Sequence, residues 1–354
     1  MTASAEASLP EDASASSVVA AEAGGAVSAV TPAPAGKRVP DFFIIGHEKS
    51  GTTALFRMLQ GHPQIYMPDL KEPRFFMRDA GSPVPKTKGF YPHTLDEYLS
   101  LFAAASPEQR AGEASPQYIR SPAAARRIAD VQPTARIIAI LREPTSFLRT
   151  YHFQNVGSAI ETERDLRKAM ALEEPRRQGE CIPRRCPAPG RLLYSDHVRY
   201  VEQLRCYDAL FPPGHVLPLI YEDFRRDNEA TVRQVLRFLE VDDSLPIEAV
   251  EVNSGRRKAV RFMRLHYMTR ALKRARHNPA AASPVARTVN ALIPRPLRGH
   301  ASELIWRRVV YSIPPPPDEE LLLELRRRFK PEVVALSDYL GRDLVTLWGY
   351  DSID

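Results

Sequence analysis

The segment Phe42–Thr53, FFIIGHEKSGTT, constrains the fold of this chain more than any other feature of its sequence. Its apolar run ending in Gly46 predicts a short, fully buried strand, and a helix is predicted to follow over residues 53–59 and to stop near Gly61. A tight turn between a buried strand and a helix directs several backbone N–H groups, and the positive end of the helix, at one place. With Lys49 inside the turn and hydroxyl groups at the helix start, the segment predicts a phosphate-binding loop.

Strands and helices continue to alternate after this loop. Strands are predicted at residues 137–141 and 216–221, each preceded by a helix-like stretch, at 123–130 and 194–210. Two further helices are predicted at 229–239 and 319–340, the last ending at Gly341. Such alternation is typical of a doubly wound parallel sheet. The predicted fold class is therefore α/β, with a P-loop nucleotide-kinase-like three-layer fold and a central parallel sheet.

Residues 1–38 differ in composition from the rest of the chain. They are rich in Ala, Ser, Gly and Pro and have almost no large apolar side chains. Such a segment buries too little surface to offset the entropy lost on ordering, so we expect a disordered N-terminal arm. Residues 39–354 are expected to form one domain, with irregular loops at 175–191 and 278–300.

The predicted loop differs from the loop of ATP-dependent kinases, GxxxxGK[ST], at the decisive position. Position 52 holds threonine where that loop places its lysine, and Lys49 lies three residues earlier. Arg142 follows the strand 137–141, where a kinase would place a carboxylate for Mg²⁺. Lys49 is instead suited to a donor whose bridging oxygen gains negative charge as the bond to the transferred group breaks. A small-molecule kinase and a non-catalytic nucleotide-binding protein remain the alternatives.

Four stretches of the sequence together resemble the family of sulfotransferases that use 3′-phosphoadenosine-5′-phosphosulfate (PAPS), especially its bacterial members and its heparan sulfate branch. These stretches are FFIIGHEKSGTTALFRMLQGHP (42–63), KEPRFF (71–76), GEASPQY (112–118) and IIAILREPTSFLRTY (137–151). The resemblance implies a sulfotransferase domain over 39–354, with the 5′-phosphosulfate held by Lys49, Ser50, Gly51, Thr52 and Thr53. It also implies that Arg142 and Thr150 hold the 3′-phosphate, as a guanidinium and a hydroxyl would.

The resemblance also suggests the group that accepts the proton. Glu72-Pro-Arg74-Phe-Phe is similar to the E-x-H-F-F pattern of the heparan sulfate branch, which implies that Glu72 is the general base. Lys49, whose place in the loop suits it to assist the leaving oxygen, is the other expected catalytic residue. Glu113 is a rival base. Ala114 stands where that branch has a lysine, and Arg74 is a candidate to supply the missing positive charge.

The surplus of basic residues is concentrated late in the chain. The net charge is +6, and residues 255–308 contain fourteen Lys and Arg against one acid, Glu303. The resemblance implies that Arg256 and Arg257 belong to a loop that closes over the nucleotide. The basic surplus permits an anionic acceptor, and no nucleic-acid-binding motif accompanies it, so nucleic acid is not an expected partner.

The remaining features limit the class of protein. Cys181, Cys186 and Cys206 are too few for a disulfide scaffold, and neither they nor the nine histidines have the spacing of a metal site, so PAPS without a metal is expected. The chain has no run of about 18 apolar residues and no signal-like N-terminus, which predicts a cytoplasmic protein without a transmembrane segment. The expected acceptor is a hydroxyl, less favourably an amine, on a carbohydrate, lipid or secondary metabolite. The sequence predicts no particular oligomeric state.

Overall fold

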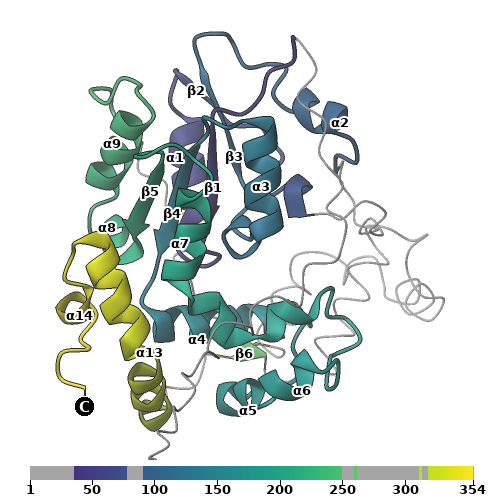
Figure 1. Cartoon of the computed structure of the whole chain (residues 1–354), viewed down its shortest axis with the longest axis vertical. Coiled ribbons are helices and arrows are strands. Elements are labelled where there is room, and N and C mark those ends of the chain that lie inside the picture. Colours follow the sequence, from purple (N-terminus) through teal and green to yellow (C-terminus); the bar gives the residue numbers. More distant parts are fainter. Residues whose placement is uncertain (1–35, 78–90, 249–258, 261–310, 313–317, 354) are drawn as a thin grey trace, which may run out of the picture.

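The computed structural model describes residues 36–77, 91–248, 259–260, 311–312 and 318–353 (Figure 1). Arg256, Arg257, the predicted loop 278–300 and nearly all of the predicted arm 1–38 lie outside these residues.

A parallel sheet forms the centre of the molecule. Its five strands are β1 (Phe42–Gly46), β2 (Ile65–Tyr66), β3 (Arg110–Ala114), β4 (Arg136–Leu141) and β5 (Val216–Ile220). They lie in the order β2-β3-β1-β4-β5, and every neighbouring pair is parallel. β1 is thus the middle strand, and the loop that follows it emerges at the centre of the sheet edge. The predicted parallel α/β fold is confirmed.

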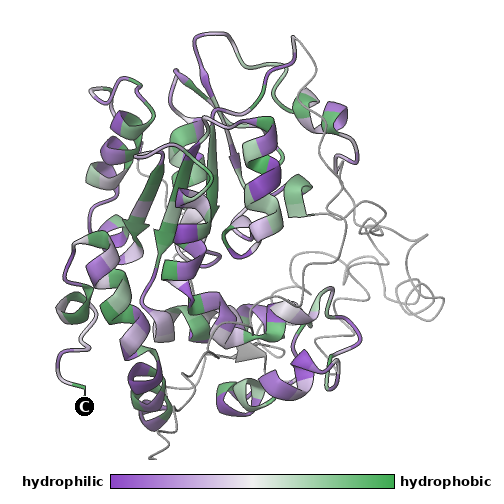
Figure 2. Ribbon diagram, in the orientation of Figure 1, coloured by the Kyte–Doolittle hydropathy of each residue, from purple (hydrophilic) through white to green (hydrophobic). Residues whose placement is uncertain are grey.

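The central strands β1 and β4 are buried on both faces, as their continuous apolar sequences predict. Phe43 and Ile45 pack into one hydrophobic core, whereas Phe42 and Ile44 pack into the other, because successive side chains of a strand point to opposite faces. All five residues of β1 are buried. Figure 2 shows the central strands in the green of hydrophobic residues.

Helices cover both faces and complete three layers (Figure 1). The core that contains Phe43 receives side chains from α3 (Pro122–Val131), α4 (Pro144–Gly157), α7 (Tyr200–Asp208) and α13 (Glu319–Leu340). The core that contains Phe42 receives side chains from α1 (Thr52–Gln60), α8 (Tyr221–Arg226) and α9 (Asn228–Phe238). Gly341 caps α13 in the left-handed region with φ of 59°, as its position in the sequence predicted.

The other elements are short. They are η1 (Phe75–Met77), α2 (Leu95–Ser100), η2 (Tyr118–Arg120), α5 (Leu166–Ala171), α6 (Glu173–Arg177), η3 (Pro189–Leu192), η4 (Tyr194–Val198), α14 (Leu344–Leu347) and the antiparallel pair β6 (Ala259–Val260) and β7 (Tyr311–Ser312). The predicted helix 194–210 is divided into η4 and α7 at Arg199. In the predicted loop 175–191, regular structure is confined to the two ends, which belong to α6 and η3. No helix within the described ranges is long and apolar enough to cross a membrane.

Candidate active site

The loop between β1 and α1 has the geometry of an anion-binding site. Gly51 precedes α1 with φ of 90°, and a Cβ atom there would lie 2.9 Å from the ring of Phe224, so the position requires glycine. The N-cap residue Gly51 has no side chain with which to cap α1, and the first turn of the helix holds no acid. An anion placed before this helix would therefore be stabilised by its N–H groups and its dipole.

The polar side chains of the loop also indicate an anion-binding site. Ser50 is fully buried, and its hydroxyl has no hydrogen-bond partner within the described part of the protein. A buried hydroxyl without a partner is costly, which indicates that a ligand or water completes it. Thr52 is also buried, whereas Thr53 is half-buried. Lys49 has a positive φ of 64°, and its carbonyl faces the end of β4.

Arg142 lies directly beside this loop. Its Nη1 donates to the carbonyl oxygen of Lys49 at 2.8 Å, and its guanidinium lies 4.5 Å from the centre of the Tyr221 ring. Its Nε and Nη2 donate to the Ser146 hydroxyl at 3.1 and 2.7 Å. Thr150 lies one turn further along α4 and donates its hydroxyl hydrogen to the Ser146 carbonyl at 2.8 Å. The structure thus brings Arg142 to the phosphate loop and makes Ser146 the hydroxyl in contact with it.

The residue that follows Arg142, Glu143, caps the start of α4 with its carboxylate. Glu143 accepts hydrogen bonds from the backbone N–H groups of Thr145 and Ser146 at 3.0 and 2.6 Å, and so caps the helix. Tyr350, close to the C-terminus, donates its hydroxyl to Glu143 at 2.6 Å. The last residues of the chain therefore help to fix the backbone next to Arg142.

Glu72 lies beside the end of β3. Its backbone N–H donates to the Ala114 carbonyl at 3.1 Å, and its carboxylate pairs with Lys71 at 2.9 Å and with Arg74 at 2.5 Å. Burial alone would raise the pKa of Glu72, but the charges and hydrogen bonds of Lys71 and Arg74 outweigh it and lower the pKa to about 2. Glu72 is therefore ionised at neutral pH. Arg74, the candidate to replace a lysine at Ala114, forms an ion pair with Glu72, and 44% of its side chain is exposed.

Glu113 is enclosed in the core. It is fully buried, and its Oε2 accepts hydrogen bonds from Tyr98 at 2.9 Å and from Tyr118 at 3.1 Å. Burial raises the pKa of Glu113 to about 7, against the hydrogen bonds that favour its ionised form. Its register opposite Phe43, three residues before the end of β1, places it behind the phosphate loop. Glu113 therefore lies among aromatic side chains of the core, with its carboxylate away from solvent.

Four residues near the loop were absent from the predicted site: Glu48, Gln117, Arg120 and Arg191. Glu48 is buried, accepts a hydrogen bond from Gln117 Nε2 at 2.9 Å, and lies 3.6 Å from Arg120 and 3.5 Å from Arg191. The same Gln117 Nε2 reaches Glu72 at 3.4 Å. Glu48 had a signal in the sequence, its place next to Lys49, and Gln117 belongs to the stretch 112–118 that carries the family resemblance. Arg120 and Arg191 come from η2 and η3, where no motif marks them.

His47 is buried behind the loop. Its Nε2 lies 2.9 Å from Gln203 Oε1, and its ring packs on Phe147 and Tyr200 at 5.0 and 5.2 Å between centres. Burial lowers the pKa of His47 to about 3, so the ring is neutral.

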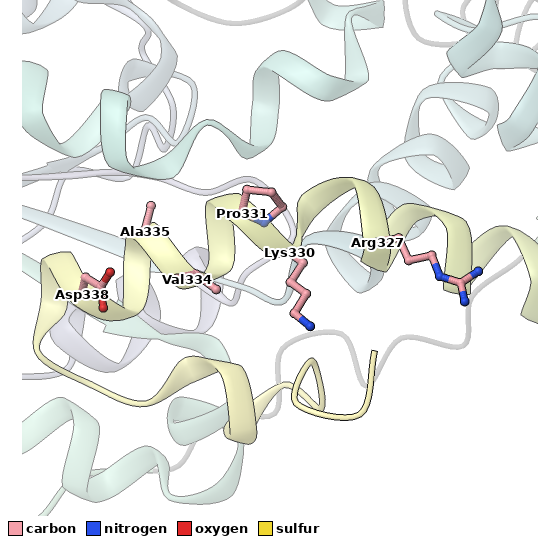
Figure 3. Close-up of a pocket in the computed structure, with 6 residues that line it drawn as sticks. All are labelled: Arg327, Lys330, Pro331, Val334, Ala335 and Asp338. Atoms are coloured by element: carbon pink, nitrogen blue, oxygen red, sulfur yellow. The ribbon is translucent and has the colours of Figure 1, made fainter. Parts of the chain in front are cut away.

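A pocket in another part of the molecule lies apart from this site. An open pocket on α13 is lined by Arg327, Lys330, Pro331, Val334, Ala335 and Asp338 (Figure 3), none of which belongs to the site. Within the described ranges, no three His, Cys, Asp or Glu side chains are placed to hold a metal ion.

Comparisons with known proteins show similarity to sulfotransferases. The model of the sulfotransferase family matches residues 40–244. The human bifunctional heparan sulfate N-deacetylase/N-sulfotransferase 3 is 29% identical over 219 residues, which cover 58% of this chain and 22% of the human protein. The mouse heparan sulfate glucosamine 3-O-sulfotransferase 6 is 30% identical over 117 residues, covering 33% of this chain and 31% of that protein. The chain thus spans less than a third of the length of these relatives.

A solved structure is similar over most of the chain. The sulfotransferase from Alicyclobacillus acidocaldarius is 25% identical, with a TM-score of 0.57, and the alignment covers 88% of this chain and 99% of that one. The family match includes the phosphate loop, Glu72 and Arg142. The chain belongs to the sulfotransferase family.

Proposed function

We propose that this protein transfers a sulfuryl group from PAPS to a hydroxyl group of an acceptor, releasing adenosine 3′,5′-bisphosphate. The observation that carries the proposal is the uncapped N-terminus of α1, with the buried hydroxyl of Ser50 left without a partner and Arg142 beside it. The loop would hold the 5′-phosphosulfate through residues 49–53. Arg142, with Ser146 and Thr150 on α4, would hold the 3′-phosphate.

The transfer needs one bond to form and one to break at sulfur. The acceptor oxygen attacks sulfur, and the bond from sulfur to the bridging oxygen of the 5′-phosphate breaks, so that the electron pair remains on the nucleotide. Lys49 would stabilise the charge that develops on this leaving oxygen. Glu72 would take the acceptor proton. A carboxylate with a pKa of about 2 is a weak base, but the proton becomes acidic as the new oxygen–sulfur bond forms, so a weak base is sufficient.

The second part of the proposal concerns the chemical class of the acceptor. The names of the human and mouse relatives include N-sulfotransfer and 3-O-sulfotransfer on heparan sulfate. We favour a hydroxyl on a carbohydrate, lipid or secondary metabolite over an amine, with Glu72 proposed as the base that takes its proton. Residues 39–354 are proposed as the sulfotransferase domain, and the cytoplasmic location stays a prediction.

The donor is tested by titration calorimetry with adenosine 3′,5′-bisphosphate, PAPS and Mg-ATP. We expect both 3′-phosphorylated nucleotides to bind more tightly than Mg-ATP, and Arg142→Gln to reduce this preference. Arg226→Gln is a matched control, because Arg226 lies on the exposed side of α8 with 72% of its side chain accessible. Preferential binding of Mg-ATP, with transfer of phosphate to an acceptor, would establish the kinase alternative instead.

Turnover is tested with [³⁵S]PAPS and a panel of hydroxyl and amine acceptors. Lys49→Ala should abolish transfer, whereas Lys37→Ala, which changes an exposed lysine paired with Asp96, should retain it. Glu72→Gln should abolish transfer while adenosine 3′,5′-bisphosphate still binds. Normal transfer by the Glu72→Gln variant would reject this residue as the base. Nucleotide binding without transfer to any acceptor would favour the non-catalytic alternative.

A further inference from the structure

A cluster of four buried or nearly buried residues connects the phosphate loop with Glu72. This arginine cluster consists of Glu48, Gln117, Arg120 and Arg191, with 8%, 15% and 13% of the side chains of Glu48, Arg120 and Arg191 exposed. Glu48 precedes Lys49 in the loop, and Gln117 Nε2 contacts Glu48 at 2.9 Å and Glu72 at 3.4 Å. The side-chain amide of Gln117 therefore links the cluster directly to Glu72, the carboxylate that would activate the acceptor.

The two arginines are only loosely satisfied by Glu48. Their contacts with it measure 3.6 and 3.5 Å, whereas a well-formed charge-assisted hydrogen bond measures about 2.7–2.9 Å. Among the residues that the structure describes, the buried Nε of Arg191 has no hydrogen-bond partner, and neither has Oε1 of Gln117, a residue with 2% of its surface exposed. One donor and one acceptor of the cluster thus remain without a hydrogen-bond partner in the described part of the protein.

The cluster also carries a surplus of positive charge. Within the cluster, two guanidinium groups face one carboxylate. The nearby carboxylate of Glu72 is ionised, but it is already paired with Lys71 and Arg74. Burial, assisted by the charge of Arg120, lowers the pKa of His47 and His197. The ring of Tyr151 lies 6.0 Å from the Arg191 guanidinium, and burial raises the pKa of its hydroxyl. Buried charge without full compensation is costly, so a second anion would be favoured here.

We propose that Arg120 and Arg191 bind an oxyanion of the acceptor, a carboxylate or a sulfate, close to the hydroxyl that receives the sulfuryl group. This inference rests on the proposed function and restricts the acceptor to molecules with an acidic group. Glu48 occupies the arginines when no acceptor is present and holds them in position. Gln117 Oε1 accepts a hydrogen bond from a neighbouring hydroxyl of the acceptor.

The test compares pairs of compounds that differ only in the acid. Methyl β-glucuronide is paired with its carboxamide, and 4-hydroxyphenylacetate with its carboxamide, so that sugar and aromatic acceptors are both represented. Affinities are measured by calorimetry with and without saturating adenosine 3′,5′-bisphosphate. We expect at least one acid to bind about tenfold or more tightly than its amide, the effect of one good charge-assisted hydrogen bond.

Variants assign the preference to the cluster. Arg120→Gln and Arg191→Gln should each reduce the preference for the acid, Arg191→Lys should retain part of it, and the surface variant Arg226→Gln should not alter it. Glu48→Gln should increase the affinity for the acid, because it removes the competing carboxylate. A purely structural role predicts instead that Glu48→Gln lowers stability without improving acid binding, and thermal unfolding of each variant separates the two cases.

Three results would overturn the inference. The first is an equal affinity of acid and amide in both pairs, including failure of all four compounds to bind. The second is an unchanged preference in both arginine variants. The third is a selective loss of affinity for PAPS relative to adenosine 3′,5′-bisphosphate in those variants, which would assign the arginines to the transferred sulfuryl group. Failure of the nucleotide to bind would instead refute the proposed function, and the acid–amide comparison without nucleotide would still stand.

Discussion

Replacing Glu113 by glutamine should change the pH dependence of stability in a defined direction. The pKa of Glu113 is raised from 4.5 to about 7 in the folded protein, because burial disfavours its ionised form. The folded state therefore binds a proton more tightly than the unfolded state. The stabilisation from this proton is fully present below about pH 4.5 and is lost as the pH rises to about 7. A difference of about 2.5 in pKa corresponds to roughly 3 kcal/mol.

Urea denaturation of both proteins between pH 4.5 and 8.5 measures this effect. Glutamine has nearly the same shape and does not ionise, so subtracting its free energy of unfolding from that of the wild type removes the contribution of every other titrating group. We expect the difference to shift by about 3 kcal/mol in favour of the variant as the pH rises, with most of the change between pH 5 and 7. A difference that stays flat within about 0.5 kcal/mol, or that shifts in favour of the wild type as the pH rises, would refute the reasoning.

Three further changes test other parts of the structure. Gly51→Ala should lower stability and weaken binding of adenosine 3′,5′-bisphosphate more than Gly214→Ala does. Alanine at either positive-φ position costs about 1–2 kcal/mol, but of these two glycines it is Gly51 whose new Cβ atom would meet an aromatic ring. Equal effects of the two substitutions on melting temperature and affinity would contradict this. Lys71→Met should raise the pKa of Glu72, so that the fall of kcat/KM in acid moves to a higher pH in a [³⁵S]PAPS assay, and a profile identical to the wild type would show that Lys71 does not set the base. Tyr350→Phe removes a 2.6 Å hydrogen bond to Glu143 and should lower the free energy of unfolding by about 1.5–3 kcal/mol, more than Tyr66→Phe, whose hydroxyl bonds a neutral carbonyl; a smaller loss than that control would be inconsistent with the bond.

Much of the fold could be predicted because its evidence is local. The strands β1, β4 and β5 are short apolar runs, and the periodicity of residues 229–239 and 319–340 predicted α9 and α13. β3 was not predicted, because Arg110–Ala114 has the sequence RAGEA, which has no strand pattern. Its small residues have a tertiary reason: a Cβ atom on Gly112 would overlap the ring of Phe42 from β1. Such a requirement is visible only when the two strands are side by side.

Some residues of the candidate site could likewise be predicted from local sequence, whereas others could not. The phosphate loop was predicted because Lys49, Ser50 and Gly51 are consecutive, and their function depends on one turn between a strand and a helix. The contact of Arg142 with Ser146 joins residues only four apart, yet the sequence indicated Thr150, because the choice between two hydroxyls on α4 depends on side-chain geometry.

By itself, the sequence determined a parallel α/β fold with an anion-binding loop at its centre and the family to which the chain is similar. Only the tertiary structure decided that Glu113 is enclosed in the core and that Arg120 and Arg191 meet at Glu48. Gln117 is 69 residues from Glu48 in the chain, and Arg191 is 143 residues from it. Contacts over such separations depend on how whole helices and loops pack, which no local pattern of residues records, and they place the arginines beside the loop that the sequence had already marked.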